Sequence, residues 1–430
     1  MQIGNRDYFE RSRIDRDGQM ATYFSHASAR LYTIALMVGF WLTASGQTFA
    51  QTYGIELHNT LMPASGAMGG ASIAMPQDCL SAINGNPATL TDFDGTHFTF
   101  GAAWAEPTYN ITQLDPLPFV DVDPFSAKSG TPGGSAPNIG VTQETSMGGV
   151  PAVFGLGLIT CAGGGVEFRD VPESNGTSAE YICLNINAAL GVPITDRFSL
   201  GGAFTIGNAF LDGPFTDTGG MTLAYGMRGT IGATYRLLPD TSLGAYWQTK
   251  EHFHFDDAAL IDATAYDVSF DHPENLGLGI ADSSLMEGRL LLAMDVLFKQ
   301  YSNADFLQAI YKNQWVYQFG AQYAVNPRLK LRCGYSYNTN PMRDPIVTEI
   351  GGVPVDDGIP ALRYIQAQFA AICQHHLTGG VGVSDVLPGI DLDVLAGGMF
   401  QESQQFASTI ATVESYWAGA YFTWRFGADQ

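Results

Sequence analysis

The sequence predicts an all-β fold: a transmembrane antiparallel β-barrel of about fourteen strands, with a compact N-terminal segment plugging its lumen. Three observations predict it. The N-terminus has the pattern of a secretory leader, no later stretch could form a membrane helix, and the rest of the chain alternates apolar and polar residues. The composition agrees, because the 430-residue chain has 14% charged residues, 12% aromatic residues and 50 glycines. A large antiparallel sheet with many tight turns suits these values, whereas a disordered chain carries more charge.

Residues 1–50 are expected to be a signal peptide. The uncharged run over 31–44 fits the hydrophobic region of a leader and is too short to span a bilayer, which needs about 20 apolar residues. Thr48 and Ala50 place small residues at the two positions that a signal peptidase reads, so Gln51 is the expected mature start. Because the stretch before Met20 is long and charged for a leader, Met20 is an alternative initiator. A membrane anchor is the competing interpretation of the same run.

The stretches after the leader favour a barrel over a soluble periplasmic protein. In YICLNINAALGV (181–192) the even-numbered residues are apolar, whereas Asn185 and Asn187 lie on the opposite face. The same alternation recurs in the stretches 223–236, 289–299 and 329–338. A closed soluble core would not bury such polar faces unpaired, and strands of this length suit a tilted membrane crossing.

The barrel is expected over 96–426, followed by a short tail, 427–430. Its strands are expected to start near His97, Pro137, Pro151, Glu180, Arg197, Met221, Thr241, Thr264, Arg289, Asn313, Arg328, His376, Ile390 and Ser415. Tight Pro-, Asp- and Asn-rich connections, such as LLPDT and AVNPR, are expected at one end. Longer connections at the other end are expected over 113–136, 162–179, 256–263, 302–312 and 341–360.

Residues 51–95 differ from all that follows them. They are rich in Gly, Ala and Ser, too irregular for a strand and too apolar for a solvated tail. A compact piece inside the barrel lumen accounts for this composition. Pro87 fixes its own φ angle and pushes Asn86 out of the helical region, so NGNPATL (84–90) is expected to hold a rigid turn.

This segment resembles the hatch of the FadL/TodX-like family, the outer-membrane long-chain fatty acid and hydrocarbon transporters. The matching residues are Gly66, Ala67, Met68, Gly69, Gly70, Ala71, Asp78, the Asn86-Pro87-Ala88 signature and Leu90. Later stretches over 272–283, 290–305, 318–341 and 375–383 also fit the family's order of strands. Two features depart from the family: the loop 211–220 is short, and the terminal aromatic residue, Phe426, is followed by four more residues.

The resemblance implies a passive transporter of hydrophobic molecules in a Gram-negative outer membrane, with long-chain fatty acids as the first expectation and aromatic hydrocarbons as the alternative. It places the hatch over 51–95, the ligand near the hatch start, and a lateral exit at a kink in strand three. The corresponding residues are Asn86, Pro87 and Ala88 for the hatch turn, Gly54, Ile55 and Leu57 for the ligand end, and Pro151, Gly155, Gly157, Gly163 and Gly164 for the kink. The implied partners are hydrophobic small molecules, outer-membrane lipid with lipopolysaccharide, and the barrel assembly machinery.

Other functions find less support in the residues. The net charge of −22 argues against nucleic acid, whose phosphates it would repel. An outer-membrane lipid hydrolase would need a nucleophile and a base, and no such motif is visible, so no enzyme activity and no cofactor are expected. A structural barrel, which would fill its lumen with salt bridges, is the third class.

No metal site is expected from local spacing. His252 and His254 share a strand face but have no obvious third ligand, and His375 and His376 point to opposite faces. The stretch 115–124 contains Asp121 and Asp123 and is interpreted as an acidic solvated loop rather than a Ca²⁺ site.

Five cysteines are present, an odd number, so at least one has no partner within the chain. Cys161 and Cys183 flank the loop 162–179 and are both expected to face inward. A disulfide between them is left open.

Overall fold

The computed structural model describes residues 54–213, 221–261, 264–344, 348–350, 353–355 and 360–426, with backbone only for 259–261, 264–266, 348–350 and 353–355. The expected leader, its cleavage site, the tail 427–430 and most of the loop 211–220 lie outside these residues. All described residues belong to one compact unit, Gln47–Gln430. None of the helices within the described ranges is both long and apolar enough to cross a membrane.

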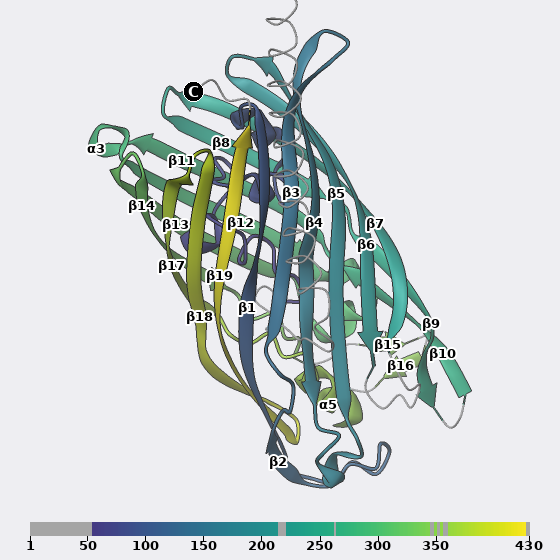
Figure 1. Cartoon of the computed structure of the whole chain (residues 1–430). Coiled ribbons are helices and arrows are strands. Elements are labelled where there is room, and N and C mark those ends of the chain that lie inside the picture. The colour runs from purple at the N-terminus through teal and green to yellow at the C-terminus, as the bar shows by residue number, and fades with distance from the viewer. Residues whose placement is uncertain are drawn as a thin grey trace, which may run out of the picture. The chain divides into compact units, whose positions relative to one another are not determined.

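Fourteen antiparallel strands form a closed ring, as expected (Figure 1). In pairing order they are β1 (Thr96–Gln113), β3 (Gly134–Met147), β4 (Val150–Glu167), β5 (Ser178–Thr195), β6 (Phe198–Asp212), β7 (Thr222–Leu238), β8 (Thr241–Gln248), β11 (Glu274–Ser284), β12 (Leu290–Gln300), β13 (Gln314–Asn326), β14 (Leu329–Asn338), β17 (His375–Leu387), β18 (Ile390–Phe406) and β19 (Thr409–Phe426). Each strand pairs with the next one along the ring, and β19 closes it on β1 from Thr96↔Phe426 to Gln113↔Thr409. A short strand, β2 (Phe125–Lys128), adds to the end of β1.

The two ends of the barrel differ in the length of their connections. Tight turns and the short helix α3 (Leu285–Gly288) join strands at one end, called here the short-turn end. The opposite, long-loop end carries η3 (Pro172–Ser174), β9 (Glu251–Ile261), β10 (Thr264–His272), η4 (Tyr301–Asn303), α4 (Leu307–Ile310), β15 (Thr348–Ile350), β16 (Val353–Val355) and α5 (Pro360–Gln368). Figure 1 shows the two groups at opposite ends of the wall.

One expected wall strand is in a different place. The strand expected near Thr264 is β10, which pairs only with β9 as a hairpin beyond the barrel wall. The eighth wall strand is instead β11, which pairs with β8 and β12. The hairpin alternates just as a wall strand does, with Phe253 and Phe255 buried and His252 and His254 exposed, so period two alone could not separate them. The other expected starts lie within three residues of observed ones, except that β19 begins at Thr409, six residues before Ser415.

The expected facing of the wall residues is confirmed. Asn185 and Asn187 of β5 are buried toward the lumen, whereas Ile186 between them is 43% exposed on the outer face. Large apolar side chains make up much of the outer face, including Leu200, Phe204, Ile206, Met227, Ile231, Leu278, Leu292, Leu331, Leu377 and Val394. Aromatic pairs lie near strand ends, such as Trp424 stacked on Phe426 with ring centroids 4.9 Å apart. This outer surface has the apolar band and aromatic girdles of a membrane barrel.

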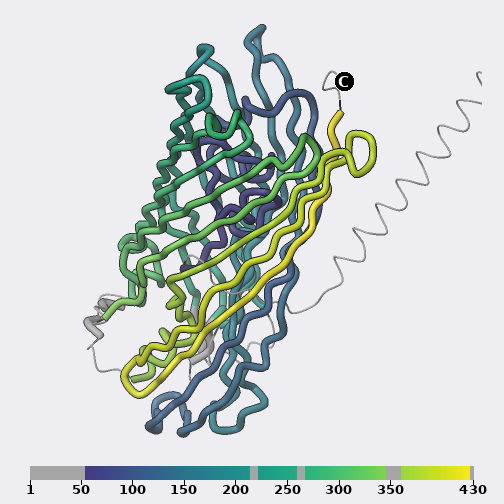
Figure 2. The backbone as a smooth tube through the Cα atoms, turned by 90° about the vertical axis from the view of Figure 1, so that its left-hand side faces the viewer, coloured from purple at the N-terminus to yellow at the C-terminus, as the bar shows by residue number. Residues whose placement is uncertain are grey.

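Residues 54–95 lie inside the ring and are called here the lumenal segment. They contain η1 (Gly66–Met68), α2 (Cys79–Asn84) and η2 (Pro87–Asp92), and nearly all of them are buried as far as Leu90. Figure 2 shows this purple stretch enclosed by the wall. η1 contacts β13, β14, β17 and β18, while η2 contacts β4 to β7, so the segment touches opposite sides of the ring.

Glycines on the inner face of the wall let the lumenal segment approach the strand backbones. A Cβ atom added at Gly201 would lie 2.4 Å from the nitrogen of Ala88, and one at Gly244 would lie 2.2 Å from the carbonyl oxygen of Ile73. At Gly334 the corresponding distance, to the nitrogen of Gly69, is 2.0 Å. By contrast, a Cβ atom added at the outward-facing Gly202 would meet no atom closer than 3.9 Å. The segment and the wall therefore fit each other backbone to backbone.

Candidate functional site: the lumenal segment and its anchors

Asp78 organises the lumenal segment from within. It is the N-cap of α2, where its carboxylate accepts a 2.8 Å hydrogen bond from the backbone N–H of Ser81. The same carboxylate accepts hydrogen bonds from the backbone N–H groups of Ala64 and Ser65, at 3.0 and 2.9 Å. One buried carboxylate thus satisfies donors from two parts of the segment, as a capping residue does at a helix start. Asp78 is among the residues that carry the family resemblance.

The Asn86-Pro87-Ala88 turn fastens the segment to β7. Asn86 is extended, with φ −95° and ψ 102°, and caps η2, whose first residue is Pro87. Its amide Nδ2 donates hydrogen bonds to the carbonyl oxygens of Ile73 and Ala233, at 2.8 and 3.1 Å, and its Oδ1 accepts one from the N–H of Ala88. A turn is therefore present at these residues, and the Asn86 amide bonds both the lumenal segment and the wall.

Replacing Asn86 by alanine is expected to weaken docking of the lumenal segment by about 1–3 kcal/mol, because the buried carbonyls of Ile73 and Ala233 would lose their donor. Asn86→Asp should have a similar effect, since aspartate keeps the acceptor for Ala88 and loses both donated bonds. The measurement is hydrogen exchange of the peptides that cover 54–95.

The matched control is Asn326→Ala. Asn326 also accepts hydrogen bonds from backbone N–H groups, those of Arg328 and Leu329, but it lies in an exposed turn at the short-turn end. Its loss should leave exchange of the lumenal segment unchanged. Equal protection in the Asn86 variants and the control would contradict the anchoring role.

Two further anchors come from other strands of the ring. Asp295 of β12 is buried, and its carboxylate accepts hydrogen bonds from the backbone N–H groups of Ser72 and Ile73, at 2.6 and 2.9 Å. Thr378 of β17 donates its hydroxyl to the carbonyl oxygen of Ala67 and accepts from the N–H of Gly69. Wall residues therefore bond the family-like Gly-Ala-Met-Gly-Gly-Ala stretch (66–71) through Thr378 and the two residues that follow it through Asp295.

A buried ionic cluster holds the start of the lumenal segment. The carboxylate of Glu56 lies 2.7 Å from a guanidinium nitrogen of Arg228 and 2.9 Å from the ammonium of Lys299. Asn275 donates its amide to both carboxylate oxygens, at 3.1 and 3.2 Å. All of these side chains are almost fully buried. One carboxylate therefore compensates two buried cations that come from β7 and β12, and this glutamate is called here the latch.

The pKa of Glu56 reflects this cluster. Burial alone would raise the pKa, but Lys299 and Arg228 outweigh burial and hold it well below its usual range. Burial and Lys299 lower the pKa of the neighbouring His58 to about 3, so His58 is neutral at pH 7. Because the folded-state pKa of Glu56 is depressed, its stabilising contribution is complete above its unfolded pKa and is lost only as the pH falls toward the lower folded value.

The latch lies beside an irregularity in β4, the third strand of the wall. The register of β4 against β5 shifts between Thr160 and Ala162, which leaves Cys161 as an extra, bulged residue. The carbonyl oxygen of Cys161 accepts a 2.8 Å hydrogen bond from the N–H of Leu57, and Glu56 forms an isolated bridge with Ala162. The start of the lumenal segment is thus bonded directly to the bulge.

Pairing of β4 with its other neighbour also stops here. The last β3–β4 pair is Asn138↔Ile159, and the β3 residues 134–137 pair only with β1. Asn138 replaces the next ladder bond with its side chain, which accepts from the N–H of Thr160 at 2.9 Å. The paired wall is therefore interrupted beyond this point, in a stretch called here the β3–β4 interruption.

The residues considered for a kink fall on both sides of the bulge. Gly163 and Gly164 pair with β5 just beyond it, while Pro151 lies at the start of the strand. Gly155 and Gly157 lie between these positions and admit Ile83 of the lumenal segment against the wall. The bulged residue itself is a cysteine, which no Gly or Pro signal could have indicated.

Gly54, Ile55 and Leu57, expected at the ligand end, begin the lumenal segment. Gly54 has φ +66°, and the N–H of Ile55 donates to the hydroxyl of Tyr301 at 3.3 Å. Ile55 and Leu57 are buried in the main apolar core of the molecule. An aromatic cluster from the wall and the long-loop end belongs to the same core or, for Phe306, packs against it: Tyr181, Phe253, Phe255, Phe270, Tyr301, Phe306, Tyr311 and Phe369.

The rings of the aromatic cluster contact one another in sequence. Phe270 lies 4.6 Å from Tyr181 and 5.6 Å from Phe306, between ring centroids, and Phe306 lies 5.6 Å from Phe369. These residues come from a wall strand, the β9–β10 hairpin and two separate loops. Aromatic side chains from separate elements therefore form a continuous set of contacts toward the long-loop end.

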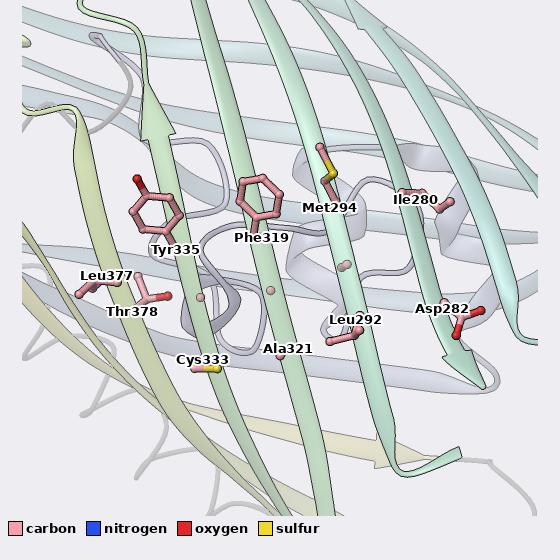
Figure 3. A pocket seen from close by; sticks show the side chains of 13 residues that line it. Ile280, Asp282, Leu292, Met294, Phe319, Ala321, Cys333, Tyr335, Leu377 and Thr378 are labelled. Atoms are coloured by element: carbon pink, nitrogen blue, oxygen red, sulfur yellow. The ribbon is translucent and has the colours of Figure 1, made fainter. Parts of the chain in front are cut away.

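A hollow of about 740 Å³ lies elsewhere, on the outer face of β11 to β14 and β17 (Figure 3). It is lined by outward-facing Leu292, Met294, Phe319 and Leu377, with the lumenal segment behind the strands in this view. Because outward-facing side chains line the hollow, it does not belong to the lumen.

Sequence reasoning missed the latch, Glu56, and the two cations that pair with it, Arg228 and Lys299. Each is an ordinary charged residue in its local stretch, and the three are brought together only by the closed ring. The sole signal was that Arg228 and Lys299 fall on the inward face by alternation. His252 and His254 do share a face, as expected, and His252 lies 2.5 Å from a carboxylate oxygen of Asp271.

Comparison with solved structures gives the fold. The Pseudomonas putida toluene transporter TodX matches with a TM-score of 0.62 and 18% identity, over 85% of this chain and 99% of that one. The Ralstonia pickettii toluene transporter TbuX matches with a TM-score of 0.62 and 18% identity, over 86% and 100%. A Pseudomonas aeruginosa FadL homologue matches with a TM-score of 0.61 and 15% identity, over 89% and 100%. No protein-family model and no curated protein matches the sequence. The resemblance to the FadL/TodX-like proteins is thereby confirmed in three dimensions: the chain has the fold of the FadL-type outer-membrane channels.

Proposed function

We propose that this protein is a passive channel for small hydrophobic molecules in a Gram-negative outer membrane. Its closed wall has an apolar outer band, and solved structures described as hydrocarbon transporters share its fold. Lipopolysaccharide makes the outer leaflet a poor route for apolar solutes, so a protein path of this kind is useful there. We place the long-loop end outside the cell and the short-turn end in the periplasm.

One observation carries the proposal most directly: the start of the lumenal segment is hydrogen-bonded to the bulge at the β3–β4 interruption. A ligand that enters among the rings of the aromatic cluster reaches Ile55 and Leu57 from the long-loop end. Displacement of this start frees the carbonyl of Cys161 and opens a lateral path through a stretch of wall that already lacks strand pairing. In this proposal residues 51–95 act as a hatch, and no energy source is needed.

The chemistry around the latch favours an uncharged ligand over a fatty acid. A carboxylate bound at this depth needs an unshared cation, because a buried charge must be paired. Both nearby cations, Arg228 and Lys299, already face Glu56. An aromatic hydrocarbon needs only apolar and aromatic contacts, which the cluster provides. We therefore propose neutral aromatic hydrocarbons as the substrate class and rank long-chain fatty acids second.

Uptake measurements test both the channel function and the proposed substrate class. Cells that lack their own transporters of this type and express the protein are given labelled toluene or a labelled long-chain fatty acid. We expect faster toluene uptake than in cells with an empty vector and little change for the fatty acid. Phe270→Ala, which opens the centre of the aromatic cluster, should alter toluene uptake at equal surface expression.

The outcomes distinguish a wrong substrate class from a wrong channel function. Faster fatty acid uptake with unchanged toluene uptake would overturn the substrate class and leave the channel. No uptake of either compound by a correctly folded barrel would overturn the channel itself and favour a structural barrel or a lipid hydrolase. Interactions with lipopolysaccharide and with the barrel assembly machinery follow from the proposed location.

A further inference from the structure

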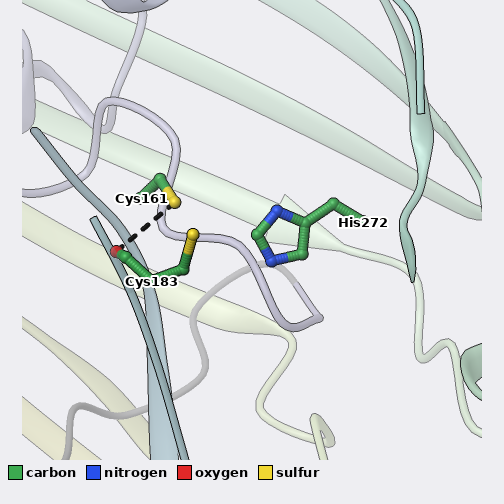
Figure 4. A group of neighbouring side chains, drawn as sticks. All are labelled: Cys161, Cys183 and His272. Carbon is green, nitrogen blue, oxygen red and sulfur yellow. Dashed lines mark hydrogen bonds between the residues drawn. The ribbon is translucent and has the colours of Figure 1, made fainter. Parts of the chain in front are cut away.

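Three metal-ligating side chains from distant parts of the chain meet beside the bulge (Figure 4). The Sγ atoms of Cys161 and Cys183 and a ring nitrogen of His272 all lie within 4.8 Å of one another. Both cysteines are free thiols, and all three side chains are buried. They come from β4, β5 and the end of β10, so only the folded barrel assembles them.

The surroundings of His272 orient it for ligation. Its Nδ1 lies 3.1 Å from Oε2 of Glu251, which assigns the ring proton to Nδ1 and leaves Nε2 as the lone-pair nitrogen. The hydroxyl of Tyr181 lies 2.7 Å from that Nε2. Carboxylate–histidine pairs of this kind orient the histidine ligands of protein metal sites. The other oxygen of Glu251, Oε1, is buried and has no hydrogen-bond partner among the described residues.

We propose that Cys161, Cys183 and His272 form a binding site for a thiophilic divalent cation, Zn²⁺ being the expected occupant. Two cysteines and one histidine form a known zinc ligand set, and a water or the Tyr181 hydroxyl can complete four-coordination. On binding, both thiols lose their protons to solvent, and two thiolates, a neutral imidazole and one divalent ion form an electrically neutral unit. Neutrality favours Zn²⁺ over a monovalent ion in this buried position, because an uncompensated charge there is costly.

Occupancy would add a direct link among three parts of the molecule that pairing and hydrogen bonds already bring together. The bulge at Cys161 holds the start of the lumenal segment through Leu57, Cys183 lies on the next wall strand, and His272 ends the hairpin that contributes Phe253, Phe255 and Phe270. A bound ion would therefore fix the β3–β4 interruption to the base of the β9–β10 hairpin. The binding itself does not depend on the protein being a channel.

Metal titration of the mature, folded protein in detergent micelles, kept reduced, tests the site. With Co²⁺ as a spectroscopic probe we expect thiolate-to-cobalt charge-transfer absorption that saturates at one ion per chain and is displaced by Zn²⁺. About two protons should be released per ion bound. Cys161→Ser and Cys183→Ser should each remove the absorption, while His272→Gln and Glu251→Gln should weaken binding about 10–100-fold.

The chain provides matched controls. Cys79→Ser and Cys373→Ser remove buried cysteines that lie outside this group, and Cys333→Ser removes an exposed one, so all three should bind as the wild type does. Heat-modifiable gel mobility verifies folding of each variant. Absence of the charge-transfer band in folded wild-type protein would overturn the proposal. A Cys161–Cys183 disulfide in protein extracted from membranes would also overturn it and would show that the pair is a structural cross-link.

Discussion

Replacing Glu56 by glutamine is expected to release the start of the lumenal segment while the barrel still assembles. Glutamine has nearly the same shape, but it removes the charge that compensates Arg228 and Lys299 and replaces one accepting oxygen with an amide that donates. Breaking a buried charge pair costs about 3–5 kcal/mol, because the remaining charge stays buried without compensation. Hydrogen exchange should therefore rise in peptides that cover 54–62 and much less in those that cover 78–92. Leakage of small polar solutes into the cell should rise with it.

If Glu56 acts as the latch, a second substitution should restore part of the protection that Glu56→Gln loses. Adding Lys299→Met to Glu56→Gln removes one of the two uncompensated cations and should recover part of the lost protection. Glu167→Gln is the matched control, since Glu167 also pairs with an arginine, Arg169, but both side chains are partly exposed and exposed pairs contribute at most about 1 kcal/mol. Wild-type exchange in Glu56→Gln would show that the segment is held without the latch.

Placing arginine at Ile186 should impair assembly of the wall. Ile186 faces outward from the middle of β5, where it pairs with Ile206 of β6 and Leu158 of β4. An arginine on the lipid face costs about 2–4 kcal/mol near the bilayer midplane. The folded fraction, read from heat-modifiable gel mobility, should fall in Ile186→Arg.

The same strand supplies the control. Ile194→Arg places the same charge at an exposed position near the short-turn end, where the cost is about 0–1 kcal/mol. Ile194 is 53% exposed, so neither position is sterically crowded. Equal folded fractions in the two variants would contradict the assigned membrane depth. Asn185 and Asn187, although polar and inward-facing, are poor sites for an arginine, because they are buried.

The wall could be predicted from the sequence because its signal is local. Period-two alternation in a single stretch such as 181–192 decides which side chains face lipid, and the observed facing agrees. The same locality explains the one misplaced strand. β9 and β10 alternate because the hairpin has its own buried face, made of Phe253, Phe255 and Phe270, so their pattern equals that of a membrane crossing.

The candidate site could be predicted only where its residues are neighbours in the chain. The Asn86 turn was visible because proline restricts the residue before it, and the structure adds its bond to the carbonyl of Ala233. The ionic cluster brings the latch, Glu56, into contact with Lys299, and the proposed metal site brings Cys161 close to His272. Closure of the ring creates these contacts, and a single sequence contains no periodicity that encodes them.

The inward glycines have a consequence for anyone who would rebuild this barrel as an open nanopore. Replacing a strand glycine with alanine normally stabilises the folded protein by about 0.5–1 kcal/mol, and it is a common stabilising substitution. Here it suits outward positions such as Gly202, where a methyl group meets no atom closer than 3.9 Å. At Gly201, Gly244 and Gly334 the methyl group would occupy the place of the lumenal backbone. Those positions become available to the engineer only when residues 54–95 are cut away, so truncation and glycine replacement belong in one design step.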